Sequence, residues 1–227
     1  MTCVIACSKL WRPNLASRVQ QASGEEVHLV TTKDEFNVEY LNRIAPTWIF
    51  LPHWSHRIPQ EIYTRWNCVL FHMTDLPFGR GGSPLQNLIV RGFKETKISA
   101  FLCSEVVDSG PIYLKAPLSL HGSAQEIYLR ATDTIEAMIL QILGENITPK
   151  PQMGEEVQFA RRKPEDSNVI DLDSLEKLYD WIRMVDAEDY PKAFVEIGHF
   201  RFEFSKARLR GTEIVADVSI RERGHGI

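Results

Sequence analysis

Residues 71–91 read FHMTDLPFGRGGSPLQNLIVR, and this stretch gives the clearest indication of the fold of the chain. The apolar run that leads into it from Cys68 predicts a buried strand ending at His72. A loop rich in glycine and proline follows, and Pro84 stands where the first turn of a helix begins. Ligands of open α/β sheets bind beyond the carboxyl ends of the strands, so His72 is expected at the edge of a binding site.

Strand and helix patterns alternate on both sides of this stretch. Apolar runs that predict strands cover 4–8, 27–30, 47–51, 97–103 and 113–120, and helical patterns cover 14–22, 35–44 and 123–143. Ser123 to Glu126 match a capping box at the start of the longest helix. Strands that alternate with helices favour parallel pairing, so the sequence predicts an α/β fold with a mostly parallel sheet.

Prolines mark a division after the longest helix. Pro149 and Pro151 interrupt the periodic pattern, and 147–170 is expected to be a linker. An amphipathic pattern over 174–185, followed by alternating runs, predicts a small C-terminal α+β unit at 171–227. The main domain is then expected at 1–146.

Composition excludes several classes of protein. The chain of 227 residues carries a net charge of −4, which argues against binding nucleic acid through a broad basic face. Its N-terminal apolar run lacks the pattern of a signal peptide, and no run is long enough to cross a bilayer. Its four cysteines show no spacing typical of disulfides or metal sites. We therefore expect a cytoplasmic protein without a metal site.

Two motifs resemble those of a known family. The first family motif runs Asn-x-His, Ser, Leu-Pro, Arg-Gly and Pro; it is matched in order and spacing by His72, Leu76-Pro77, Arg80-Gly81 and Pro84, with Thr74 in place of the serine and Leu70 in place of the asparagine. The segment 106–112, VVDSGPI, is similar to the Asp-x-Gly-x-Ile segment of the same family. The chain thus resembles the folate-dependent formyltransferases over most of its length.

The resemblance implies a Rossmann-like formyltransferase domain, with 10-formyltetrahydrofolate as the formyl donor. It also implies that His72 and Asp108 are the catalytic residues. An imidazole titrates near neutral pH and suits the proton transfers that accompany attack of an amine on a formyl carbon. A nearby carboxylate orients the ring and favours its protonated form, which makes Asp108 the natural partner of His72.

Leu70 departs from the family motif at a position of chemical importance. The family's asparagine donates a hydrogen bond to the developing oxyanion, and leucine cannot donate. Losing one such donor costs about a hundredfold in rate or more, so an active enzyme needs a substitute. The leading candidates are His53 and then Thr74; Gln86, Asn87 and a protonated His72 are the others.

A further set of residues is expected to bind substrate or cofactor. These are Trp54, Arg80, Gly81, Gly82, Pro84 and Gln86. Glycines let the backbone approach a ligand, and the guanidinium of Arg80 is suited either to a ligand or to stabilising the loop. Trp54 lies in the loop 52–56, which equally fits a packing role. The basic run 161–163 is either a solvated linker or a contact for phosphates.

Within the family, the sequence of residues 72–87 is most similar to that of the sugar N-formyltransferases of the pseudaminic acid type. That resemblance implies transfer to the primary amine of a nucleotide-linked amino sugar in surface-glycan biosynthesis. Neither nucleic acid nor a membrane is expected as a partner, and the oligomeric state is left open, with a homodimer among the options. Two alternatives remain: a methionyl-tRNA formyltransferase-like enzyme, and a non-catalytic folate-binding relative. No GxGxxG follows the first strand, so NAD is not expected.

Overall fold

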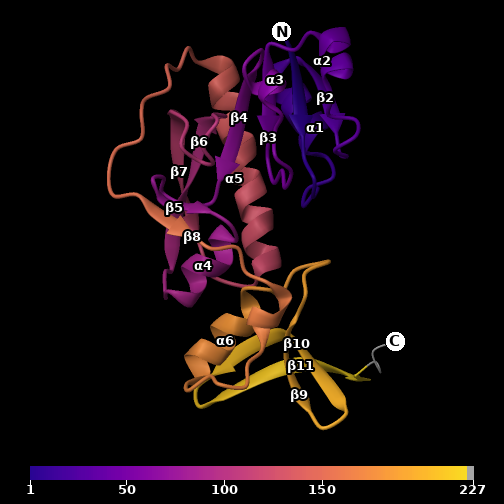
Figure 1. Ribbon diagram of the computed structural model, residues 1–227, viewed down its shortest axis with the longest axis vertical. Helices are drawn as coiled ribbons and strands as arrows, with labels where there is room; N and C mark the ends of the chain where they lie inside the picture. The colour runs from indigo at the N-terminus through magenta and orange to yellow at the C-terminus, as the bar shows by residue number, and fades with distance from the viewer. Residues whose placement is uncertain (224–227) are drawn as a thin grey trace. The chain divides into compact units, whose positions relative to one another are not determined.

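The computed structural model describes residues 1–223, and within them the strands form a six-stranded, a three-stranded and a two-stranded sheet (Figure 1). The largest sheet has the strand order β2-β1-β3-β4-β6-β7. Its strands are β1 (Thr2–Ala6), β2 (Glu26–Val30), β3 (Trp48–Leu51), β4 (Asn67–His72), β6 (Glu95–Leu102) and β7 (Ile112–Ser119). Strands β2, β1, β3 and β4 pair in parallel and β6 runs antiparallel to β4. The expected α/β fold with a mostly parallel sheet is confirmed.

The strand register places the ends of β3 and β4 at one edge of this sheet. Leu51 is paired with Leu70, so His53 and His72 each lie two residues beyond that pair. On the other side of β4, His72 is opposite Ser99 of β6. The parallel part of the sheet therefore brings the two histidine-bearing strand ends to the same edge.

Helices alternate with strands along the chain. They are α1 (Leu15–Ser23), α2 (Val38–Ile44), α3 (Gln60–Tyr63), α4 (Pro84–Val90), α5 (Ala124–Gly144) and α6 (Leu175–Arg183), with a short 3-10 turn at Pro164–Ser167. One buried cluster comprises Val4, Ala6, Val30, Phe36, Leu41, Ile49, Leu51, Ile58, Ile62 and Cys68. Its strand members occupy alternate positions, because successive side chains of a strand point to opposite faces of the sheet. Among residues 1–223, no helix has both the length and the apolar character that a membrane span requires.

Contacts divide the chain into two compact units. Unit 1 comprises Met1–Gly81, Thr96–Leu118 and Tyr128–Phe159. Unit 2 comprises Gly82–Glu95, Ser119–Ile127 and the residues from Ala160 onward. Each unit is thus built from segments that are separated in the sequence. The domain boundaries expected after 146 and 170 remain a prediction.

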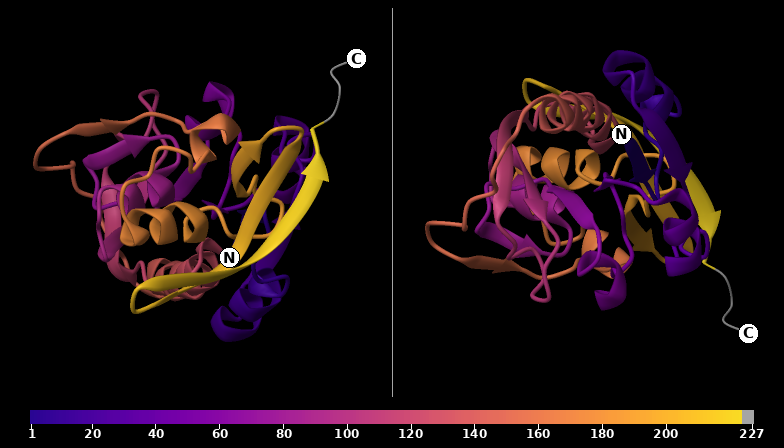
Figure 2. Two further views of the ribbon diagram at one scale, coloured as in Figure 1. Left: turned by 90° about the horizontal axis from the view of Figure 1, so that it is seen from below. Right: turned by 90° about the horizontal axis from the view of Figure 1, so that it is seen from above.

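Unit 2 contains α6 and the antiparallel sheet of order β11-β10-β9. The strands are β9 (Ala193–Ile197), β10 (Phe200–Arg210) and β11 (Glu213–Glu222), and the last two form a long ribbon (Figure 2). Arg183 at the end of α6 is buried, pairs with Asp180 at 2.6 Å, and donates to the carbonyls of Leu120 and Gly122 at 2.6 and 2.9 Å. These bonds fix α6 to the segment that precedes α5.

The two-stranded sheet lies where the sequence pattern predicts only a loop and a linker. Strand β5 (Phe78–Gly81) is part of the glycine-rich stretch, and it pairs in parallel with β8 (Val157–Phe159). Gly81 has a φ of 101°, and a Cβ there would lie 2.5 Å from the carbonyl oxygen of Phe159. Glycines break the side-chain alternation on which strand prediction depends, so the pattern does not reveal this pairing.

Candidate active site

His72 ends strand β4 with 9% of its surface exposed. Its Nε2 lies 2.7 Å from the carbonyl oxygen of Gly79. A carbonyl only accepts hydrogen bonds, so Nε2 carries a proton and donates it there. Nδ1 is then the ring nitrogen that remains to take up or release a proton. It lies 3.6 Å from Oδ2 of Asp108.

Asp108 lies in the loop between β6 and β7 and has a left-handed φ of 53°. Aspartate and asparagine tolerate this conformation better than most residues that carry a side chain. Its Oδ2 accepts the backbone N–H of Gly81 at 2.9 Å. Gly110 keeps the loop close to β6, because a Cβ there would lie 1.7 Å from the carbonyl oxygen of Leu102. The structure thus brings His72 and Asp108 together, while their catalytic role remains a prediction.

Thr74 is fully buried beside this pair. Its hydroxyl donates to the carbonyl oxygen of Gly79 at 3.3 Å, the acceptor that His72 also uses. Its own carbonyl accepts the hydroxyl of Ser99 at 2.8 Å. Thr74 therefore fixes the turn after β4, and its proton is committed to Gly79. This geometry counts against Thr74 as the substitute oxyanion donor.

Arg80 on β5 is occupied by protein groups. Only 8% of the residue is exposed, and its Nη1 lies 2.6 Å from Oε2 of Glu156. Its Nη2 and Nε donate to Oε1 of Gln152 at 2.8 and 3.2 Å. Of the two roles weighed for this cation, these contacts favour stabilising the loop over binding a ligand.

His53 follows β3 and forms a contact with helix α5. Its Nε2 lies 2.9 Å from Oγ1 of Thr132, and that hydroxyl donates its proton to the carbonyl oxygen of Tyr128 at 2.8 Å. Nε2 therefore carries the proton in the contact with Thr132. Burial lowers the pKa of His53 to about 4, so at neutral pH its Nδ1 has no proton to donate. These properties count against His53 as the oxyanion donor.

Leu70 and Trp54 both pack against the apolar core cluster. Leu70 is half-buried and offers no polar atom at the position of the family's asparagine. The ring centroid of Trp54 lies 5.2 Å from those of Phe36 and His56. Such ring contacts fit the packing role that the loop 52–56 equally suggests.

Gly82, Pro84 and Gln86 belong to unit 2. A Cβ at Gly82 would lie 2.6 Å from the Cα of Arg161, so glycine permits close approach of that backbone. Pro84 is the first residue of α4, as its place in the sequence predicts. Gln86 is 4% exposed and donates to a backbone carbonyl of unit 2 at 3.0 Å. Asn87 donates to three backbone carbonyls of the same unit.

The basic run 161–163 is not uniformly solvated. Arg162 is half-buried, and its guanidinium lies 5.2 Å from the ring centroid of Trp181. Its backbone N–H donates to the hydroxyl of Ser83 at 3.0 Å. One of the three cations therefore contributes to packing within unit 2.

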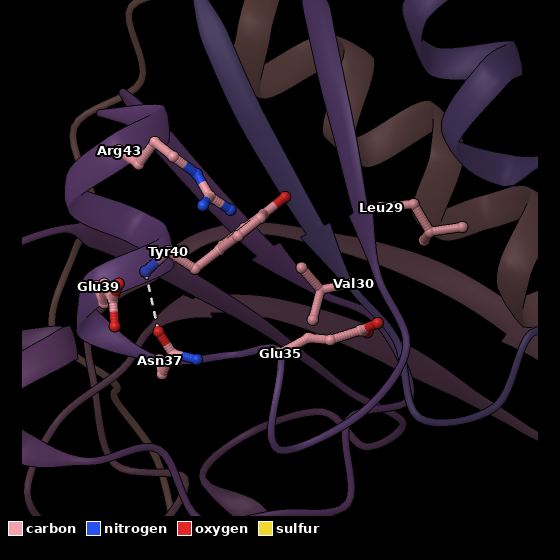
Figure 3. Close-up of a pocket in the computed structure, with 7 residues that line it drawn as sticks. All are labelled: Leu29, Val30, Glu35, Asn37, Glu39, Tyr40 and Arg43. Atoms are coloured by element: carbon pink, nitrogen blue, oxygen red, sulfur yellow. Dashed lines mark hydrogen bonds between the residues drawn. The ribbon is translucent and has the colours of Figure 1, made fainter.

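A hollow of about 450 Å³ lies between α2 and β2 (Figure 3). Its lining consists of Leu29, Val30, Glu35, Asn37, Glu39, Tyr40 and Arg43. The polar groups serve local structure: Asn37 caps α2 by accepting the N–H of Tyr40 at 2.9 Å. Strands β1 and β3 separate β2 from β4 in the sheet. The hollow is therefore not part of the His72 site.

The arrangement at His72 is suited to proton transfer. It combines an imidazole that is anchored through one nitrogen with a carboxylate that is anchored by a backbone N–H. In the part of the chain that the structure describes, no cluster of His, Cys, Asp or Glu could hold a metal ion. Motif spacing predicts that His72 and Asp108 form a pair, but it does not reveal the contact of His72 with Gly79 or that of Gln152 with the Asp108 loop. A glycine in the sequence indicates a flexible backbone, but it does not indicate that its carbonyl oxygen accepts a hydrogen bond from a histidine ring. A single glutamine in an expected linker belongs to no motif.

Comparison with known proteins identifies the family. Residues 164–221 match the family model described as the C-terminal domain of methionyl-tRNA formyltransferase. The solved structure of methionyl-tRNA formyltransferase from Clostridium thermocellum is 46% identical and has a TM-score of 0.95, covering 98% of this chain and 100% of that chain. This chain belongs to the formyltransferase family that contains the methionyl-tRNA formyltransferases.

Two other relatives are less similar in sequence. Methionyl-tRNA formyltransferase from Thermodesulfovibrio yellowstonii is 25% identical over 159 residues, which are 66% of this chain and 52% of that protein. The chain thus spans about half the length of this curated relative. A sugar N-formyltransferase structure from a Shewanella species is 14% identical with a TM-score of 0.65, covering 96% of this chain and 96% of that chain. That likeness shows the fold alone.

These relatives confirm the resemblance to formyltransferases and contradict two finer expectations. The amino-sugar substrate and the absence of a nucleic-acid partner are both wrong, since the more similar relatives are methionyl-tRNA formyltransferases. The motif at 72–87 builds the loop around His72, so it does not identify the acceptor. The net charge of −4 is a sum over the whole chain, and it conceals local groups such as Lys206, Arg208 and Arg210 on β10.

Proposed function

We propose that this chain transfers the formyl group of 10-formyltetrahydrofolate to the amino group of methionyl-tRNA. The observation that carries the proposal is the His72–Asp108 pair, anchored by the carbonyl of Gly79 and the N–H of Gly81. Membership of the formyltransferase family supports the donor, and the identity of 46% with the Clostridium thermocellum protein supports the acceptor.

The residues of the site fit this chemistry. When bound, 10-formyltetrahydrofolate supplies the formyl carbon that the amine attacks. His72 Nδ1 takes the proton that the amine loses as the new carbon–nitrogen bond forms, and it returns the proton to the departing nitrogen as the old bond breaks. Asp108 stabilises the imidazolium that exists between these events. The bond from Nε2 to Gly79 holds the ring, so the proton moves at Nδ1.

Leu70 is the feature that favours a rival function, the binding of folate without turnover. It packs against the apolar core and places no donor where the family motif has asparagine. Without a substitute donor, transfer would be slowed by about a hundredfold or more. Folate binding without turnover is therefore distinguished from the proposed function by the rate of formyl transfer and not by binding of the donor.

A single-turnover assay with 10-formyltetrahydrofolate and methionyl-tRNA tests the proposal. We expect formylmethionine to be detected by mass after hydrolysis of the tRNA ester, with phenylalanyl-tRNA as the control acceptor. His72→Asn should lower the rate by about a hundredfold or more, since general acid–base groups contribute that much. Tetrahydrofolate binding measured by calorimetry, with no formylated methionine formed, would contradict the proposal and favour the rival.

A further inference from the structure

Gln152, in the segment between α5 and β8, contacts the loops that carry both groups of the candidate pair. Its Nε2 donates to the carbonyl oxygens of Asp108 and Gly110 at 2.8 and 2.9 Å. Its Oε1 accepts two hydrogen bonds from Arg80 at 2.8 and 3.2 Å. The side-chain amide therefore uses both of its hydrogens and its oxygen at once.

These partners permit only one orientation of the amide. Turning it over would place the amide hydrogens against the N–H groups of Arg80 and the amide oxygen against two carbonyl oxygens. Donors would then face donors and acceptors would face acceptors. Gln152 is thus locked by its partners, and its position in turn restricts theirs.

Arg80 connects this amide to the backbone that holds the pair. It stands between Gly79, whose carbonyl anchors His72, and Gly81, whose N–H anchors Asp108. The bonds therefore form a closed ring that runs from Arg80 through Gln152 to Asp108 and back to β5 at Gly81, and His72 joins this ring at Gly79. Glu156 balances the charge of the largely buried Arg80 at 2.6 Å.

We propose that Gln152 is a positioning residue for formyl transfer, which holds the Asp108 loop against β5 and so sets the separation of His72 Nδ1 and Asp108 Oδ2. Asp108 has a left-handed backbone, which aspartate tolerates, and the two hydrogen bonds from Gln152 hold the loop in that conformation. The kinetic consequence rests on the proposed function. The effect on the His72 ring does not.

Gln152→Glu is the sharpest variant, because it keeps the size of the side chain and an acceptor for Arg80 but removes both donors to the loop. The matched control is Gln141→Glu on the exposed surface of α5. In the full chain without substrate, the ¹⁵N chemical shifts of the His72 ring should report protonation at Nε2 in the wild type. We expect these shifts to change in Gln152→Glu and to stay unchanged in Gln141→Glu.

The same variants are compared in single-turnover and steady-state assays. Gln152→Glu should lower kcat about 10- to 100-fold, because misplacement of a catalytic group by about 1 Å has effects of that size. The KM values for both substrates should stay within about threefold, since the variant leaves binding groups in place. Arg80→Lys should retain more activity than Arg80→Met, because it keeps a donor to Gln152 Oε1.

Unchanged His72 ring shifts in a folded Gln152→Glu protein would overturn the inference. A wild-type protein that transfers no formyl group would instead refute the proposed function and leave the ring measurement to decide the role of Gln152. If Gln152→Glu fails to fold, the ¹⁵N shifts of the His72 ring are compared in Arg80→Lys and Arg80→Met. These variants change the hydrogen bond between Arg80 and Gln152 at the arginine. Identical ring shifts in those two variants and the wild type would also overturn the inference.

Discussion

At the scale of single residues, the negative charge of Asp108 can be removed without removing its structural contacts. Its Oδ2 accepts the N–H of Gly81, which an amide oxygen can also do, and its φ of 53° suits asparagine equally well. What asparagine cannot supply is the negative charge beside His72. Substitution at this position can therefore test chemistry without disturbing the loop.

Asp108→Asn should fold with nearly unchanged stability and lose about 10²- to 10⁴-fold in the rate of formyl transfer. Asp108→Ala should in addition lower the free energy of unfolding by about 1–3 kcal/mol, because the N–H of Gly81 is left without its acceptor. Single-turnover rates and urea unfolding of both variants check this. Wild-type rates in Asp108→Asn would contradict the catalytic role.

Gly110 is the second residue whose replacement has a clear physical outcome. Alanine there would place Cβ 1.7 Å from the carbonyl oxygen of Leu102, so the loop must move away from β6. We expect Gly110→Ala to lower the free energy of unfolding by about 2–4 kcal/mol, in the range of other backbone clashes and overpacked sites. Gly144→Ala is the control, since a Cβ there meets nothing within 4 Å. Equal urea midpoints for the two variants would refute the account.

The sequence predicts which residues lie close together where motifs fix their order, but it does not predict contacts that depend on the fold. His72 and Asp108 could be paired because two motifs occur in the expected order. The occupation of His53 by Thr132 could not be predicted, since 79 residues separate them. The sequence leaves Arg80 either a ligand-binding or a loop-stabilising cation, and only the structure reveals its contacts with Gln152 and Glu156.

At the scale of elements, the contact between the loop after β3 and helix α5 depends on a neutral imidazole. Burial lowers the pKa of His53 from 6.5 to about 4, while the unfolded chain keeps the ordinary value. Between these two pH values the unfolded state binds more protons than the folded state. Stability is therefore lost as pH falls from 6.5 towards 4.

His53→Asn should remove this part of the pH dependence. Asparagine tolerates the left-handed φ of 49° at this position and does not titrate. The loss of stability between pH 6.5 and 4 should be smaller by about 3 kcal/mol, since each pKa unit corresponds to about 1.4 kcal/mol. Urea unfolding at several pH values measures it. Parallel pH curves for the variant and the wild type would contradict the assigned cause.

The elements themselves were predictable in proportion to the regularity of their patterns. Strands β1, β3 and β4 and the long helix α5 follow clear apolar periodicity, and the structure has them within a few residues of the expected positions. Strands β5 and β8 do not, because β5 consists largely of glycine and arginine and β8 has three residues. Their existence depends on pairing with each other and not on local preference.

At the scale of the whole molecule, the stability of each unit can be lowered separately by replacing one residue. That residue is Gly110 in unit 1 and Arg183 in unit 2. Arg183 lies in unit 2, where its loss would remove the hydrogen bonds that it donates to Asp180 and to two backbone carbonyls. Gly110 lies in unit 1. The pair provides a test of whether the units unfold independently.

In calorimetry we expect two unfolding transitions, one for each unit. Arg183→Met should lower the midpoint of one transition by an amount equivalent to about 3 kcal/mol, the cost of breaking a buried charged network. Gly110→Ala should lower the midpoint of the other. A single transition that both variants shift alike would show instead that the units unfold cooperatively.

The α/β class followed from the alternation of strands and helices, but the acceptor substrate did not follow from any motif. Motifs at 72–84 and 106–112 report the surroundings of the His72–Asp108 pair. Whole-chain similarity at 46% identity supports the proposed acceptor, which these short motifs do not identify.

The pairing of β5 with β8 limits how this site can be transferred to another protein. A fragment that stops at residue 146 would contain His72 and Asp108, yet it would lack Gln152 and the strand that covers β5. A transplanted site would therefore have to carry the chain as far as Phe159, although the last residue with a proposed chemical role is Asp108. In protein engineering, the segment after α5 is a component of the site and not a replaceable spacer.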